Sequence, residues 1–140
     1  MILACSFSFF QTIPAMSDNP IQVPADNADN ADKVTSAAPF YAHHVFFCLN
    51  QRAPGERVCC ANNGAQAAQE HAKRRIKALG LAGEGMVRIN KAGCLERCEE
   101  GPALVIYPEG VWYTYVDNED IDEIIDVHIV GGKIVERLKI

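Results

Sequence analysis

Residues 44–48 read HVFFC and residues 59–64 read CCANNG, and a loop marked by Pro54-Gly55 joins them. The first run is apolar and β-prone along its whole length, which is typical of a strand buried on both faces. It ends at Cys48, and the loop closes at Cys59-Cys60. The sequence therefore predicts a buried strand that carries one cysteine at its end, and then a loop that brings two more.

An amphipathic helix is expected directly after this loop. The residues of its expected buried face recur at helical spacing: Ala65, Ala68, Ala72, Ile76 and Leu79. The residues of its expected exposed face are polar: Gln66, Gln69, Lys73 and Lys77. Asn62 or Asn63 is the expected N-cap and Gly80 the expected stop.

The rest of the chain indicates three strands and a second helix. Strands are expected at 86–89, 103–107 and 111–115, and the hairpin turn Pro108-Glu109-Gly110 joins the last two. The helix is expected from near Asn118 to Gly131-Gly132, and its buried face is Ile121, Ile124, Ile125 and His128. Residues 134–138 are expected to add an edge strand or to lie across a partner. This order predicts an α/β fold with a mixed sheet of about four strands and two main helices.

The charges divide the chain into unequal parts. The 140 residues are 49% hydrophobic and 22% charged, which is ordinary for a globular protein. Residues 43–91 carry eight basic and three acidic side chains, whereas residues 92–140 carry four basic and eleven acidic ones. We therefore expect a bipolar folded part, which bears on docking more than on fold.

Residues 1–42 are expected to form a disordered tail, because they are poor in aliphatic residues after Met16 and repeat Ala-Asp-Asn. Residues 1–15 are expected to come from a start upstream of the natural one. No basic residue precedes their apolar run, as a secretory signal would require, and the run is too short to span a bilayer. We therefore expect a cytoplasmic protein without a membrane segment, whose single domain spans residues 43–140.

Five of the six cysteines fall in that domain, and each lies in or beside a loop at the end of a strand: Cys48, Cys59, Cys60, Cys94 and Cys98. The sixth, Cys5, lies in residues 1–15, which are expected to come from a start upstream of the natural one. In a cytoplasmic protein this number of cysteines favours metal binding or catalysis over structural disulfides. Because such loops can converge at one edge of a sheet, we expect four thiolates to meet there.

Two metals fit four thiolates, and the spacing alone does not decide between them. Four cysteines are the usual ligands of a [2Fe–2S] cluster, although the spacing departs from both common ferredoxin patterns. Structural zinc prefers cysteine pairs two to four residues apart; Cys94 and Cys98 qualify, whereas Cys48 and Cys60 do not. A zinc-stabilised binding module without a redox role therefore remains the alternative. A redox dithiol of the Cys-x-x-Cys type is excluded because the motif is absent.

From His43 to Ile140 the chain resembles the thioredoxin-like [2Fe–2S] ferredoxins of the Shethna type, over about 70% of its length. It is also similar to the small iron–sulfur subunit of respiratory complex I and to its hydrogenase relatives. The shared motifs are, in chain order, a strand ending in Cys48, Cys60-Ala-Asn-Asn-Gly64, Gly93-Cys94-x-x-x-Cys98, Gly101-Pro102, Tyr107–Tyr113 and Gly131–Leu138.

The resemblance implies a thioredoxin-like fold, a homodimer and a one-electron carrier that works with redox partner proteins. An enzyme is not expected, because the sequence offers no nucleophile–base constellation. It implies cluster ligation by Cys48, Cys60, Cys94 and Cys98, because Cys60 precedes Ala61 and Gly64 at the family's spacing. Neighbouring residues of an extended chain point to opposite sides, so Cys59 is expected to face away. A subunit of a larger NADH-linked oxidoreductase or hydrogenase is the near alternative.

Among the charged residues beside the proposed ligands, Glu96, Glu99 and Glu100 are expected to disfavour reduction, and Arg97 to oppose them. The basic run Lys73–Lys77 is expected to be a solvated helix face, because no nucleic-acid-binding motif accompanies it. His43, His44 and His71 are expected to be surface groups rather than metal ligands.

Overall fold

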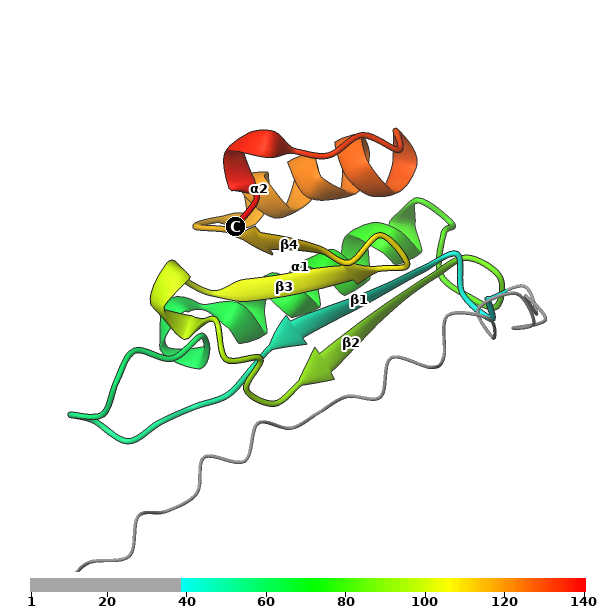
Figure 1. The fold of residues 1–140 in the computed structure, drawn as a ribbon. Coiled ribbons are helices and arrows are strands. Elements are labelled where there is room, and N and C mark those ends of the chain that lie inside the picture. The colour runs from blue at the N-terminus through cyan, green and yellow to red at the C-terminus, as the bar shows by residue number, and fades with distance from the viewer. Residues whose placement is uncertain (1–38) are drawn as a thin grey trace, which may run out of the picture. The chain divides into compact units, whose positions relative to one another are not determined.

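The computed structural model describes residues 39–140, and Figure 1 shows their fold. Four strands form one sheet: β1 (His43–Cys48), β2 (Val87–Ala92), β3 (Ala103–Tyr107) and β4 (Val111–Thr114). Their order is β2-β1-β3-β4; β1 is parallel to β2 and antiparallel to β3, and β3 is antiparallel to β4. The predicted mixed sheet of four strands is confirmed. The predicted tail lies, apart from residues 39–42, outside the described residues.

Helix α1 (Ala65–Ala78) connects the parallel strands β1 and β2 and lies behind the sheet in Figure 1. Side chains alternate across a strand, so Val45 and Phe47 of β1 point to the same face of the sheet. Both pack in one core cluster with Ala72 and Ile76 of α1. The helix therefore covers the face of the sheet that carries Val45 and Phe47. Phe46 on the opposite face is only half-buried, so β1 is not buried on both faces as predicted.

The predicted buried face of α1 is confirmed except at two positions. Gln69 is 1% exposed and Leu79 is 40% exposed, the reverse of what was expected. Gln69 lies four residues after Ala65 and three before Ala72, so it is at the centre of the buried stripe, whereas Leu79 lies just beyond the helix. The N-cap prediction is also wrong: the cap is Gly64 in a left-handed conformation, and no side chain caps the helix.

The second helix packs against α1 and confirms the predicted buried face. Helix α2 (Asn118–Glu123) continues as η3 (Ile124–Val130), whose wider turns are π-helical, and Gly131 follows it. The side chain of Asp117 caps the start by accepting a hydrogen bond from the Asp120 amide at 3.0 Å. The residues buried on its inner face are those predicted: Ile121, Ile124, Ile125 and His128.

The predicted edge strand at residues 134–138 does not form. A short 3-10 turn, η4 (Glu136–Leu138), is found instead. Val135 and Leu138 are both buried, and the turn puts these residues, three apart, on the same side. The chain meets the sheet beyond this turn, where Lys139 lies opposite Tyr113 and the Ile140 amide donates to the Trp112 carbonyl at 3.1 Å.

One edge of the sheet collects the strand ends that carry cysteines. Because β1 and β2 are parallel, Cys48 at the end of β1 lies opposite Ala92 at the end of β2. The antiparallel β3 begins at this same edge, where Leu104 pairs with Phe47.

Within residues 39–140, no helix is both long and apolar enough to cross a membrane.

Candidate metal centre

Four of the five described cysteines reach this edge from different elements. Cys48 ends β1, and Cys94 follows the end of β2 by two residues. Cys98 opens η2 (Cys98–Glu100), shortly before β3 begins. Cys60 comes directly before η1 (Ala61–Asn63), the turn that leads into α1. The parallel pair β1–β2 and the reversal into β3 are therefore what bring these loops together.

The sulfur atoms converge closely. The Sγ atoms of Cys48, Cys60 and Cys98 all lie within 4.8 Å of one another, and this is the only group of three or more metal-ligating side chains found in the described part of the chain. Cys94 is not part of that group, but its Sγ is 3.7 Å from the Sγ of Cys98. Two sulfurs bound to one tetrahedral metal at about 2.3 Å are separated by a similar distance. The donor set therefore fits a thiolate-bound metal centre.

The two adjacent cysteines of the loop lie in different surroundings. Cys60 belongs to the sulfur group, whereas the Sγ of the equally buried Cys59 accepts a hydrogen bond from the Arg52 amide at 3.4 Å. The backbone of Cys60 is helical, with φ −64° and ψ −36°. The separation of the two side chains therefore arises at a turn, and not in an extended segment as the sequence argument assumed.

The pKa of the Cys60 thiol is raised to about 12, chiefly by burial; a backbone hydrogen bond from Ala103 opposes this rise and the hydrogen bond to Cys48 adds to it. Its Sγ donates to the carbonyl oxygen of Gly101 at 3.8 Å. A thiol with this pKa is protonated at neutral pH, so a metal that binds there must displace the proton.

A glycine is required at position 101 because a side chain there would collide with β4. The φ of Gly101 is +107°, and a Cβ at this position would lie 2.5 Å from Thr114 Oγ1. Gly101 contributes its carbonyl oxygen to the site, where it accepts the hydrogen bond from Cys60 Sγ. A backbone amide also reaches one of the sulfurs: that of Glu96 lies 3.4 Å from Cys94 Sγ.

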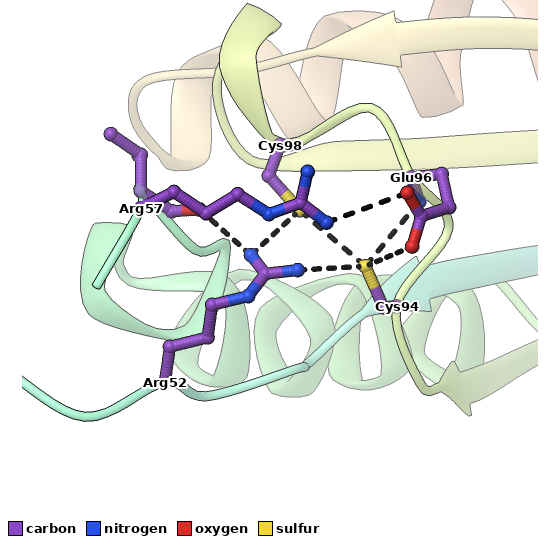
Figure 2. A network of polar contacts seen from close by, with 6 residues as sticks. Arg52, Arg57, Cys94, Glu96 and Cys98 are labelled. Carbon is purple, nitrogen blue, oxygen red and sulfur yellow. Dashed lines mark hydrogen bonds and ion pairs between the residues drawn. The ribbon is translucent and has the colours of Figure 1, made fainter. Parts of the chain in front are cut away.

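Arg52 is the functional residue that the sequence argument missed. Figure 2 shows its guanidinium between two sulfurs: Nη1 donates to Cys98 Sγ at 3.4 Å and Nη2 to Cys94 Sγ at 3.2 Å. The hydrogen bond to Cys98 makes the largest contribution to a raised pKa of Arg52, so its charge persists at all physiological pH values. The signal in the sequence that could have indicated Arg52 is its position four residues after Cys48, the cysteine that ends β1.

Arg97, the residue expected to provide this charge, is engaged elsewhere. Its guanidinium pairs with Glu100 at 2.7 Å and lies over the ring of Trp112, 5.4 Å from the centroid. Arg57 is also engaged with a carboxylate, that of Glu96, at 3.4 Å (Figure 2). Arg52 therefore provides the positive charge in contact with the sulfurs.

Tyr115 places an unused hydroxyl near the same centre. Its Oη is buried without a hydrogen-bond partner among the described residues. Burial raises the pKa of Tyr115, and the nearby charges of Cys60 and Cys48 raise it further. Buried hydroxyls are normally satisfied, so a donor without a partner beside thiolates is consistent with a bound group that accepts the hydrogen bond.

The four described histidines do not join the sulfur group. His71 bonds to Asp122 at 2.9 Å, and His128 bonds to the Tyr113 hydroxyl at 2.8 Å. His43 and His44 are half-buried at the start of β1. His43, His44 and His71, which were expected to be surface groups, are all partly exposed.

Comparison with known proteins finds two relatives that are both named 2Fe-2S ferredoxins. No protein-family model matches the chain. A 2Fe-2S ferredoxin of Clostridium pasteurianum is 37% identical over 100 residues, which are 70% of this chain and 95% of that protein. A 2Fe-2S ferredoxin of Aquifex aeolicus (strain VF5) is 40% identical over 98 residues, 69% of this chain and 87% of that protein.

Solved structures agree with these relatives. The wild-type thioredoxin-like [2Fe-2S] ferredoxin from Aquifex aeolicus superposes with a TM-score of 0.63 at 38% identity, covering 70% of this chain and 95% of that one. A second structure of a thioredoxin-like [2Fe-2S] ferredoxin from the same organism gives a TM-score of 0.64. At 38% identity, the similarity concerns the sequence as well as the fold.

Proposed function

The chain belongs to the thioredoxin-like [2Fe–2S] ferredoxin family, and we propose that it is a one-electron carrier whose single cluster is held by Cys48, Cys60, Cys94 and Cys98. The [2Fe–2S] cluster, when bound, supplies a centre that takes up and releases one electron. The observation that carries the ligand assignment is the convergence of these sulfurs at one edge of the sheet.

The surrounding residues support this function in two ways. Cys48, Cys60 and Cys98 are buried, so the protein shields this side of the centre from water, whereas Cys94 is partly exposed. An electron has a short path to a partner protein through the partly exposed side. We therefore propose that electrons are exchanged with redox partner proteins at the loops around Cys94, and that the chain is not itself an enzyme.

The decisive experiment is the chemical analysis of the full chain purified without oxygen. We expect a red-brown protein with about two irons and two sulfides per chain, which dithionite bleaches and which then gives a spin-half signal at low temperature. The Cys98→Ala variant, purified in parallel, controls for iron bound elsewhere. A colourless wild-type protein with one zinc per chain would favour a zinc-stabilised binding module instead.

We also propose that two copies of the chain form a homodimer in the cytoplasm. Phe46, Val105 and Trp112 are aligned across three strands, on the face of the sheet opposite α1. Phe46 and Trp112 are half-buried, and the nearby Tyr107 is 45% exposed. None of the five described cysteines forms a disulfide, which supports a reducing compartment. Sedimentation velocity should give twice the mass of one chain, and the mass of a single chain would overturn the pairing.

A further inference from the structure

Arg52 is held in place by the loop from which it comes. Its Nη1 donates to the carbonyl oxygen of Val58 at 2.9 Å, and its backbone amide donates to Cys59 Sγ at 3.4 Å. The same guanidinium spans the sulfurs of Cys94 and Cys98 with its two terminal nitrogens (Figure 2). Because the planar fork of arginine is rigid, these contacts fix both the position and the direction of the charge.

The charge of Arg52 has no carboxylate to neutralise it. In the described part of the chain, no acidic side chain lies within ion-pair distance of its guanidinium, whereas Arg57 pairs with Glu96 and Arg97 pairs with Glu100. Arg52 is also half-buried, so water screens it less than an exposed side chain. The sulfurs are therefore the negative groups nearest to its charge. The Glu96 carboxylate, 3.6 Å from Cys94 Sγ, is paired with Arg57.

We propose that Arg52 sets the reduction potential of the centre by stabilising its reduced state; this inference rests on the proposed function. On reduction, one electron passes from the donor to the site, no bond forms or breaks, and the site becomes more negative by one charge. The thiolates share that added charge. Hydrogen bonds to sulfur and a positive charge in contact with it both favour the more negative state. Arg52 therefore raises the potential and is a positioning residue, not a ligand.

The test is a spectroelectrochemical titration of the full-length, cluster-loaded protein and three variants. Arg52→Gln removes the charge, Arg52→Lys keeps the charge without the fork, and Arg57→Gln removes an equal charge from the same loop without touching a sulfur. At the wild-type midpoint we expect the ratio of reduced to oxidised protein to be about tenfold lower in Arg52→Gln, which for one electron is a midpoint lower by about 59 mV. Arg52→Lys should lie between it and the wild type, and Arg57→Gln close to the wild type.

The salt dependence of the midpoint shift distinguishes the direct contact of Arg52 with the sulfurs from the general electric field of the loop. The shift caused by Arg52→Gln should persist at high salt, because the contact leaves no room for screening ions, whereas any shift from the exposed Arg57 should vanish. If Arg52→Gln fails to retain the cluster, Arg52→Lys decides the matter, because it must still lower the potential.

Three results would overturn the inference. Equal midpoints in the wild type and both Arg52 variants would show that Arg52 does not set the potential. A shift in Arg57→Gln as large as in Arg52→Gln would show that only the net charge of the loop matters. A wild-type protein without a cluster would overturn the proposed function and the role of Arg52 together, whereas unchanged midpoints in loaded protein overturn the role of Arg52 alone.

Discussion

Two adjacent cysteines of equal burial, Cys59 and Cys60, differ in the atoms that their sulfurs contact. The Sγ of Cys60 lies with those of Cys48 and Cys98, whereas the Sγ of Cys59 accepts a backbone hydrogen bond from Arg52. A buried thiol outside the metal centre acts as a small apolar packing group. The structure thus supports different roles for two chemically identical neighbours.

Separate serine substitutions test this difference. Cys59→Ser should leave the visible spectrum of the cluster nearly unchanged, because the substituted side chain is not a proposed ligand. Cys60→Ser should lose the cluster or shift its spectrum, because oxygen replaces a thiolate. The two variants are matched controls for each other, with spectra and iron content as the measurements. Cluster loss in Cys59→Ser alone would show that the assignment to Cys60 is wrong.

Gly101 is the second residue whose identity the centre requires, and Gly101→Ala should destabilise the protein by about 2–4 kcal/mol. Its positive φ disfavours any side chain, and the added methyl group would meet Thr114 Oγ1 at 2.5 Å. Urea unfolding measures the loss, and the visible spectrum reports displacement of the Gly101 carbonyl from Cys60.

Two further variants separate strain from collision. Gly110→Ala is the control, because φ there is +67° but the added methyl group would have open space, so it should cost about 1 kcal/mol. In the double variant Gly101→Ala, Thr114→Ala, the collision is removed and only the backbone strain remains. If the double variant is no more stable than Gly101→Ala, the contact with Thr114 is not the cause.

At the scale of elements, the helical segment α2–η3 is joined to β4 by a buried polar contact. His128 is 2% exposed, and its Nδ1 lies 2.8 Å from the hydroxyl of Tyr113. That hydroxyl also accepts a hydrogen bond from the Val135 amide at 3.2 Å, and its own hydrogen is available to a neutral imidazole. Burial lowers the pKa of His128, Glu109 acts in the opposite direction, and His43 lowers it further.

The stability of the protein should therefore fall in mild acid. The folded state holds His128 neutral, and the unfolded chain binds a proton near its ordinary pKa of about 6.5. The contribution is complete above that pH and is lost as the pH falls below it. Thermal unfolding followed by circular dichroism at pH 7.5 and pH 5.5 should show a lower midpoint in acid. His128→Gln should reduce this difference, and an equal difference in the variant would exclude His128 as its cause.

At the scale of the whole molecule, the basic part of the sequence (residues 43–91) and the acidic part (residues 92–140) form ion pairs where α1 packs against α2 and η3. Arg75 of α1 pairs with Asp126 at 3.0 Å, and His71 of α1 bonds to Asp122 at 2.9 Å. Part of the predicted bipolar charge is therefore neutralised inside the domain. The basic side chains of α1 that form no ion pair across this contact are Lys73, Arg74 and Lys77.

Residues 1–38 are predicted to be dispensable for the domain, because residues 17–38, which lead into it, offer too little apolar surface to offset the entropy of ordering them. A chain that starts at Pro39 keeps the Phe40 carbonyl, which accepts a hydrogen bond from the Gly85 amide at 2.9 Å. We expect this shortened chain to retain the cluster spectrum and the thermal midpoint of the full chain. Loss of the cluster on truncation would show that the removed segment contributes to the domain.

Most of the elements, and the place where the cysteine loops meet, follow from the sequence alone. The strand ending in Cys48, the hairpin at Pro108–Gly110 and the buried face of the second helix follow from periodicity and turn chemistry, which act over a few residues. These signals sufficed to predict that the cysteine loops meet at one edge of the sheet. They failed where a residue's position in a helix was judged by its polarity, as at Gln69, which lies within the buried stripe.

Only the tertiary structure decided which groups surround the sulfurs. Arg52 and Cys98 are 46 residues apart in the chain, and they meet because the loop after β1 folds back over the end of β2 and the start of β3. The turn at Cys60 likewise separates its side chain from that of Cys59. No local pattern encodes such contacts, because they depend on the path of a loop between distant elements and not on the propensities of its own residues.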